Sequence, residues 1–313
     1  MHRYVAQRLL ALIPVLLVVS VVVFSLVRIT PGDPAAVILG DQASAEAVRQ
    51  LRQRLGLDDP LPVQFVRWIA NAVQGNLGES LFFGEPVTQM IISRLEPTLL
   101  LTLYALLIAT LLGIPLGTIA ALNRGRPLDR ALMVGSLIGI SAPSFLIGLL
   151  LILLIAVNLR WLPSGGYVPL SQGFGPNLRS LALPALALSL SQFALVARFT
   201  RTAVLEVLGA DFIRTAHAKG LEPYAVILRH ILRNALISVV TIVGLSFAVL
   251  MGGTVVIETL FDLPGVGRLV IGAVLRRDYP LLQGAVLYVT AAVVLVNLVV
   301  DLLYAWIDPR IRY

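Results

Sequence analysis

The residue types that carry out most protein chemistry are scarce in this sequence. It has no cysteine and only three histidines, so it offers no thiolate and few side chains that could bind zinc. His217 and His230 lie thirteen residues apart, which is not the spacing of a helical ligand pair. There is no phosphate-binding Gly-x-x-x-x-Gly-Lys-Ser/Thr loop, and no acid pair or Ser/His/Asp set stands out. The sequence therefore predicts no enzyme, no metal site and no cofactor bound by this chain.

One carboxylate stands inside a long apolar stretch near the C-terminus. Asp301 follows Asn297 by four residues, which places both side chains on one face of a helix. An ionised group at the centre of a membrane costs at least about 2.5 kcal/mol, so a position on a transport path or at a subunit interface is one interpretation. Asp301 also lies about two turns from the end of the stretch, and hydration there is the alternative that we favour.

A polar segment over residues 201–234 has the clearest local signals. Asp211 is able to accept backbone N–H bonds at a helix start, Lys219 complements the negative helix end, and Gly220 allows the positive φ that ends the helix. Pro223 then suits the first turn of a second helix, whose apolar face we expect to lie along the inner membrane surface; this face carries Tyr224, Ile227, Leu228 and Ile231.

The first of these helices is too short to be stable alone, because helix nucleation is costly and few hydrogen bonds follow it. Ala216 and Gly220 are four residues apart and share a face, where small side chains let a partner approach closely. The alternative is a loop helix that rests on its own membrane domain. The residues alone do not decide between these two interpretations.

The composition identifies the elements that must position these residues. Apolar residues make up 58% of the chain and charged residues 13%, and the mean hydropathy is +0.91, which excludes a soluble enzyme and a disordered tail. Such strong apolar content also argues against an outer-membrane barrel. The formal charge of +7 does not indicate nucleic acid, because basic residues in membrane chains usually mark cytoplasmic loops.

Charge-free apolar runs predict an all-α polytopic membrane protein that forms a single domain over residues 1–313 and sits in the lipid bilayer. Six transmembrane helices are expected at about 9–29, 97–123, 131–159, 180–200, 235–257 and 279–307. We interpret the first run as an uncleaved span, because no small-x-small cleavage site follows it. The run over 161–178 carries prolines and glycines and reads as a loop. Glycine and proline at Gly113-Ile-Pro115-Leu-Gly117 and Ser141-Ala-Pro143-Ser144 are either kinks at a gate or ordinary features of membrane helices, which we favour.

The distribution of Lys and Arg places both termini in the cytoplasm, because the short segments on that side hold most of these residues. Residues 30–95 then form an extracytoplasmic helical segment. Ser44 is a predicted N-cap and Gly56 a predicted stop for its first helix, and an amphipathic stretch follows over 65–73.

Arg214-Thr-Ala216-x-Ala-Lys-Gly220-Leu, with Asp211 before it and Arg229-His-x-x-Arg233-Asn234 after it, resembles the EAA loop of ABC importer permeases of the dipeptide, oligopeptide and nickel type. The resemblance extends over most of the chain through Pro31-Gly-Asp33-Pro34, Arg54-Leu-Gly-Leu-Asp58, Gly75-x-Leu-Gly-x-Ser80, Phe261-Asp-Leu-Pro264-Gly-Val-Gly267-Arg268 and Asp308-Pro-Arg-Ile-Arg-Tyr313. One departure is Ser238, where this family usually has proline. It replaces a fixed φ and a missing N–H at the start of the fifth span by a hydroxyl that is able to bond backward.

The resemblance implies the first, B-type membrane subunit of a bacterial inner-membrane importer with the type I ABC importer fold. It implies a heterodimer with a C-type permease subunit, two cytoplasmic ATPases that bind ATP and Mg, and an extracytoplasmic substrate-binding protein. Residues expected to couple the chain to an ATPase are Asp211, Arg214, Thr215, Ala216, Lys219 and Gly220. The cargo stays open among dipeptides, longer peptides, glutathione, chelated metals and oligosaccharides.

Two other classes compete with this interpretation. An ion-coupled secondary transporter often has repeated halves and intramembrane ionisable residues, whereas this chain shows no repeat and offers Asp301. An intramembrane enzyme needs a convergent nucleophile and base, and none stands out.

Overall fold

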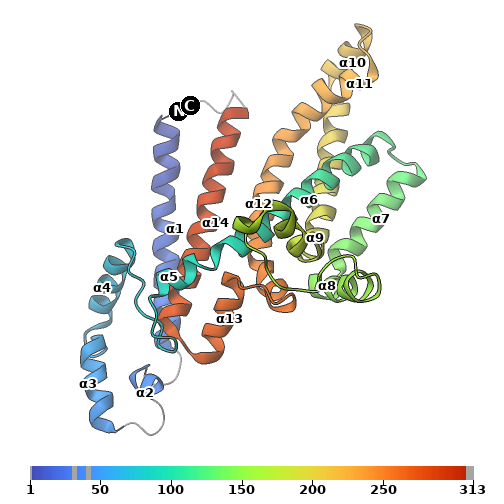
Figure 1. The fold of residues 1–313 in the computed structure, drawn as a ribbon. Coiled ribbons are helices and arrows are strands. Elements are labelled where there is room, and N and C mark those ends of the chain that lie inside the picture. Colours follow the sequence, from blue (N-terminus) through green and yellow to red (C-terminus); the bar gives the residue numbers. More distant parts are fainter. Residues whose placement is uncertain (1, 30–33, 40–43, 308–313) are drawn as a thin grey trace.

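The structure is a computed structural model that describes residues 2–29, 34–39 and 44–307 (Figure 1). These residues form helices and connecting loops and no β-strand; an isolated β-bridge joins Glu79 and Pro86. The N-terminal helices are α1 (His2–Ile29), α2 (Pro34–Leu39), α3 (Ala45–Leu55), α4 (Leu61–Val73), α5 (Val87–Ile92), α6 (Leu95–Leu122), α7 (Pro127–Ser141) and α8 (Ser144–Leu151), followed by the π-helix η1 (Ile152–Asn158).

The C-terminal half contains α9, a helix of 35 residues. Its elements are the 3₁₀ turn η2 (Leu170–Gln172), α9 (Phe174–Leu208), α10 (Asp211–Ala218), α11 (Pro223–Ala225), the π-helix η3 (Val226–Leu232), α12 (Arg233–Leu260), α13 (Val266–Arg276) and α14 (Tyr279–Ile307). α9 begins before residue 180, where we expect the fourth span to begin. Hydropathy marks the apolar part of a helix and not its polar first turns.

The predicted apolar runs all lie in helices. Four segments are long and apolar enough to cross a membrane, namely Val87–Leu122, Phe174–Leu208, Pro223–Leu260 and Tyr279–Val300. α7 and the segment Ser144–Asn158 make a fifth span only as a pair, and the described apolar part of α1, Leu10–Ser25, is shorter. With α1 as the sixth, the structure is compatible with six transmembrane helices.

The third predicted run is sharply bent. α7 and Ser144–Asn158 meet at 99°. The bend lies at Ala142, whose backbone is extended, and Pro143, which begins the next helix. A residue before proline is biased away from helical geometry, so this sequence breaks the helix. A bend is therefore present at this proline, and its interpretation as an ordinary membrane-helix feature and not a gate stays a prediction.

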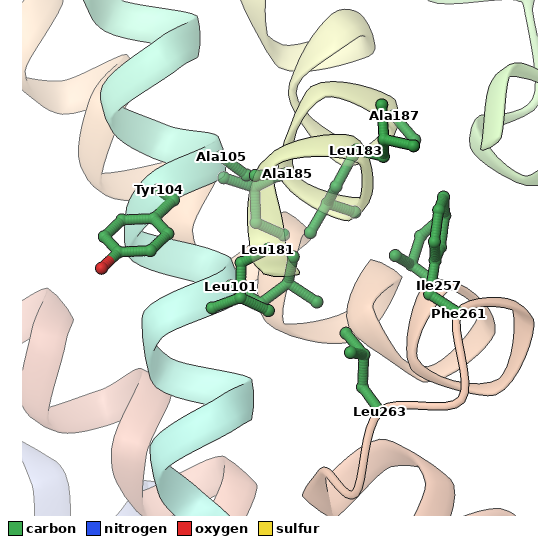
Figure 2. Close-up of a cluster of buried hydrophobic side chains, with 12 residues drawn as sticks. Leu101, Tyr104, Ala105, Leu181, Leu183, Ala185, Ala187, Ile257, Phe261 and Leu263 are labelled. Atoms are coloured by element: carbon green, nitrogen blue, oxygen red, sulfur yellow. The ribbon is translucent and has the colours of Figure 1, made fainter. Parts of the chain in front are cut away.

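The core of the bundle lies around α9, which packs against α6, α7, α8 and α12. Figure 2 shows one part of this core, where Leu101 and Ala105 of α6 lie beside Leu181 of α9 and near Ile257 of α12. Gly117 explains the close approach of α6 to α9, because a Cβ there would lie 2.4 Å from the carbonyl oxygen of Ala197.

Gly113 adds to the same close contact, because a Cβ there would lie 2.9 Å from Val196 of α9. Small residues at such positions let two membrane helices pack backbone against backbone. The two glycines around Pro115 therefore act in packing α6 onto α9, in agreement with the ordinary interpretation.

The helices predicted within residues 30–95 are present as α3 and α4. Ser44 accepts a hydrogen bond from the Ala47 N–H, and Gly56 ends α3 at φ +64°, as predicted. α4 is held to the end of α1 by Arg28, whose guanidinium donates to the Gln64 side chain at 2.7 Å. Aromatic packing of Phe24 against Phe65 and Trp68 supports the same contact.

Candidate functional site

The loop helix predicted at Asp211 is α10, and its ends are set by two different residues. Its N-cap is Ala210, which makes no side-chain hydrogen bond, so the prediction that Asp211 caps the helix is wrong. Asp211 is the first helical residue, and its carboxylate lies 3.5 Å from the Arg214 guanidinium on an exposed surface. Its negative charge still complements the positive helix end.

The C-terminal end of α10 is as predicted. Gly220 has φ +73°, a conformation that favours glycine, and it stops the helix directly after Lys219. A Cβ on Gly220 would meet nothing within 4 Å. Gly220 is therefore needed for its backbone conformation, and not for a close contact within the chain.

The inner face of α10 packs on its own chain. Ala216 is 5% exposed and Ile213 is 3% exposed, and both belong to a buried cluster with Val204, Val226 and Ile231. This corrects the expectation that Ala216 presents a small face to a partner. Tertiary packing supplies the stabilisation that a helix of this length lacks by itself.

The outer face of α10 is free in the described chain and is polar with one aromatic side chain. Phe212 is 47% exposed on the flank of the helix. The other exposed residues, among them four of the predicted coupling residues, are Asp211, Arg214, Thr215, His217, Ala218 and Lys219. Any protein partner of α10 would meet this face.

The segment after Gly220 continues directly into the fifth span. Pro223 begins a helix as predicted, but that helix runs without interruption through η3 and α12 to Leu260. The predicted separate helix along the membrane surface is therefore wrong. Periodicity showed an apolar face on Tyr224 and Leu228, which are exposed, but it did not show that the helix continues. Ser238 lies inside α12 and does not interrupt it.

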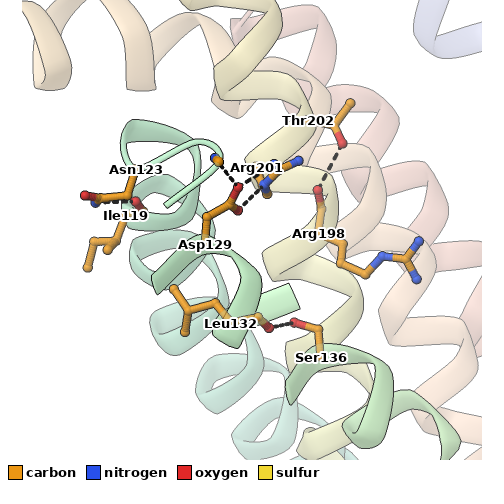
Figure 3. A network of polar contacts seen from close by, with 9 residues as sticks. Ile119, Asn123, Asp129, Leu132, Ser136, Arg198, Arg201 and Thr202 are labelled. Atoms are coloured by element: carbon orange, nitrogen blue, oxygen red, sulfur yellow. Dashed lines mark hydrogen bonds and ion pairs between the residues drawn. The ribbon is translucent and has the colours of Figure 1, made fainter. Parts of the chain in front are cut away.

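A buried ion pair joins α7 to α9 (Figure 3). The Arg201 Nε and Nη2 atoms donate to the two carboxylate oxygens of Asp129 at 2.6 Å and 2.8 Å. The Gly125 N–H donates to the same carboxylate at 2.9 Å. Asp129 is buried, so the pair fixes the turn between α6 and α7 against α9.

At the opposite end of α12 lies a second buried carboxylate, Glu258, which is 0% exposed. Its oxygens accept hydrogen bonds from the Thr98 hydroxyl at 2.5 Å and the Arg268 N–H at 2.9 Å. Arg268 is in the first turn of α13, so Glu258 satisfies a free N–H group at the start of that helix.

Sequence reasoning missed both carboxylates. Asp129 lies between two predicted spans, and its partner Arg201 was interpreted as one of the basic residues of a cytoplasmic loop. Glu258 follows the last charge-free residue of the fifth run, so it was interpreted as the first residue of a loop. A usable signal was the closely spaced pair Gly265 and Gly267 shortly after it, since glycine suits positions where the backbone makes a close approach.

The remaining predicted residues are not drawn together. Asn297 is exposed on α14. Asp301 lies in the same helix, but its side chain is outside the described residues. Within the described ranges no group of three His, Asp or Glu side chains is arranged to hold a metal ion.

Comparison with known proteins decides the family. The family described as inner membrane components of binding-protein-dependent transport systems matches residues 113–313, and its N-terminal counterpart matches residues 1–102. The chain belongs to this transport family. The resemblance to ABC importer permeases is therefore confirmed, and members of the family are multi-pass proteins of the inner membrane with no enzymatic activity of their own.

Relatives within the transport family match over the whole chain. A probable peptide ABC transporter permease of Sinorhizobium fredii is 46% identical, and the match covers 100% of both chains. A glutathione transport system permease of Escherichia coli is also 46% identical with the same coverage. A putative peptide transport system permease of Brucella abortus is 44% identical over 313 residues.

A solved structure supports the fold of the transport family for this chain. The inward-facing MetNI methionine ABC transporter aligns with a TM-score of 0.59 and 18% identity. The alignment covers 70% of this chain and 97% of that chain. The predicted all-α ABC importer architecture is thereby confirmed. The family match and the named relatives do not support the secondary-transporter alternative.

Proposed function

We propose that this chain is the B-type permease subunit of an ATP-driven peptide importer. It forms half of the translocation path, pairs with a C-type permease subunit, and receives substrate from an extracytoplasmic binding protein. Two cytoplasmic ATPases bind ATP and Mg and perform the hydrolysis. The names of the relatives, which include peptide and glutathione permeases, favour a peptide among the cargoes left open.

The observation that carries this proposal is the geometry of α10. The helix is anchored by Ile213 and Ala216, while its opposite face is exposed and belongs to the residues that resemble the EAA loop. A short helix held rigidly on one side is suited to receive force on the other. The ATPase-binding set therefore becomes Asp211, Arg214, Thr215 and Lys219, with Phe212 added and Gly220 as the helix stop.

Apolar contact should dominate the affinity of this face, because exposed ion pairs contribute only about 0.2–1 kcal/mol each. Phe212 is the large apolar side chain available on α10. We therefore expect Phe212 to be more important for ATPase binding than either member of the exposed Asp211–Arg214 pair.

Co-purification of the ATPases after detergent extraction tests the proposal. Phe212→Asp should leave a membrane-inserted chain that recovers at least tenfold less ATPase and loses ATP-dependent peptide uptake, since a central apolar contact is worth 2 kcal/mol or more, or about thirtyfold in affinity. Val73→Asp, the same kind of change at an exposed apolar residue of α4, is the matched control for ATPase recovery. Unchanged ATPase recovery and uptake in Phe212→Asp would remove the coupling role of α10.

Orientation in the membrane is a separate part of the proposal. We place both termini and α10 in the cytoplasm, and the segment around Ser80 outside. A phosphatase reporter should be active after Ser80 and inactive after Gly220. Activity after Gly220 would overturn this topology.

A further inference from the structure

One helix connects two distant features of the molecule. The segment Pro223–Leu260 is helical throughout and is about 55 Å long at 1.5 Å per residue. At its start, Val226 and Ile231 pack in the same buried cluster as Ala216 of α10. Near its end, Glu258 meets α6 and α13. A displacement of α10 would reach this distant end along a single helix.

Two side chains join three helices at that end. The Thr98 hydroxyl of α6 donates to Glu258 Oε1 of α12 and accepts the Val266 N–H of α13 at 2.8 Å. Glu258 Oε2 accepts the Arg268 N–H of the same helix. The first turn of α13 is thus bonded to α6 through a hydroxyl and to α12 through a carboxylate.

The backbone of α13 lies too close to α12 to slide past it. A Cβ on Gly265 would lie 2.2 Å from the Glu258 carboxyl carbon. A Cβ on Gly267 would lie 2.6 Å from the Cα of Val255. Both glycines are buried. This contact leaves α13 little freedom to move relative to α12 while the hydrogen bonds are intact.

The C-terminal end of α13 is tied to the loop between α4 and α5. Asp278 accepts hydrogen bonds from the Ser80 hydroxyl and, at 3.2 Å, from the Leu81 N–H. The neighbouring Phe82 is 57% exposed, and the Arg276 guanidinium lies 3.9 Å from its ring centroid. An exposed surface of α13 and the loop around Phe82 is therefore attached to the end of α12.

We propose that Thr98 and Glu258 are positioning residues that make α13 and its exposed surface move together with α12. Through them, a movement at α10 is transmitted to the opposite face of the molecule, and binding events at that face are transmitted back. This inference rests on the proposed function, because it requires the ATPases to act on α10. It adds the residues that carry the coupling beyond the helix α12.

A pair of conservative variants tests the hydrogen bonds without a change of shape. Thr98→Val replaces the hydroxyl by a methyl group, and Thr98→Ser keeps the hydroxyl. In the assembled transporter, both variants should retain their ATPases and basal ATP hydrolysis. Thr98→Val should lose at least fivefold of the stimulation of hydrolysis by peptide-loaded binding protein, whereas Thr98→Ser should keep most of it.

A second measurement reports the coupling directly. The chain has no cysteine, so spin labels on this subunit can be placed at single introduced cysteines. Val249 of α12 and Leu275 of α13 are 58% and 79% exposed and are suitable sites. With Thr98 present, the distribution of distances between the two labels should be narrow and unchanged by ATP. In Thr98→Val, this distribution should be broad.

The outcomes separate this inference from the proposed function. Failure of the unaltered chain to recover ATPases would overturn the proposed function. Retained ATPases with normal stimulation and a narrow label distance in Thr98→Val would overturn the coupling role alone. Equal loss of stimulation in Thr98→Ser would also overturn it, because the hydroxyl would then not be the group that matters.

Discussion

Asp129 and Glu258 are both buried acidic side chains, yet the two regions that hold them satisfy the carboxyl group by different means. At the α10 end, the Arg201 guanidinium pairs with both oxygens of Asp129. At the far end of α12, Glu258 makes no salt bridge to a described residue and accepts bonds from a hydroxyl and from the start of α13. Asp129 is paired with a cation, whereas Glu258 is hydrogen-bonded by neutral donors at the start of a helix.

The two sites also differ in what remains when the acid is removed. Loss of Asp129 leaves a partly buried cation without its partner, whereas loss of Glu258 leaves neutral N–H and O–H groups without an acceptor. A buried charge without a partner is more costly than an unsatisfied neutral donor. The two ends of the molecule should therefore respond unequally to the same chemical change.

The largest effect is expected for Asp129→Asn. It should lower the free energy of unfolding by about 3 kcal/mol, the lower end of the range for a broken buried pair, because Arg201 retains some contact with solvent. Thermal unfolding of the purified chain in lipid nanodiscs measures this. A loss no greater than that caused by the same change at an exposed acid, Glu206→Gln, would contradict it.

The next effect is a partial recovery. Asp129→Asn combined with Arg201→Gln should regain about half of the lost stability, because the stranded cation is removed. A double-mutant cycle from the same unfolding measurements gives the coupling energy. Additive losses in the double variant would show that the guanidinium is not the source of the penalty.

A smaller effect is expected for Glu258→Gln. One carboxylate acceptor is lost, which should cost about 1–2 kcal/mol. Arg268→Gln should neither worsen nor repair this loss, because the Arg268 guanidinium pairs with Asp262 and only its backbone meets Glu258. Rescue of Glu258→Gln by Arg268→Gln would mean that a cation balances Glu258 after all.

The smallest effect on stability is expected at the exposed pair on α10. Asp211→Asn should change the free energy of unfolding by less than about 0.5 kcal/mol, because exposed ion pairs contribute little. Its effect on ATPase recovery should also be smaller than that of Phe212→Asp. A loss of stability comparable to that of Asp129→Asn would show that α10 is held by its charges and not by Ile213 and Ala216.

Features that depend on residues close together in the sequence were predictable, whereas contacts between distant residues were not. Apolar runs predicted the spans, and Gly220 and Ser44 predicted helix ends, because these signals are local. The buried face of α10 was not predictable, since Ala216 looks the same whether it meets its own chain or a partner. Asp129 and Arg201 are 72 residues apart, and Thr98 and Glu258 are 160 apart. No spacing rule joins such pairs; the topology must be known first.

The 99° bend between α7 and α8 also has a consequence for the surrounding lipid. α7 has 15 residues and reaches only about 22 Å, less than the hydrocarbon thickness of about 30 Å. After the bend, the chain runs nearly crosswise and adds little depth. Acyl chains alone would have to compress to cover this edge, at an elastic cost for each ångström of mismatch. A protein neighbour there, such as the second permease subunit, would relieve that local thinning.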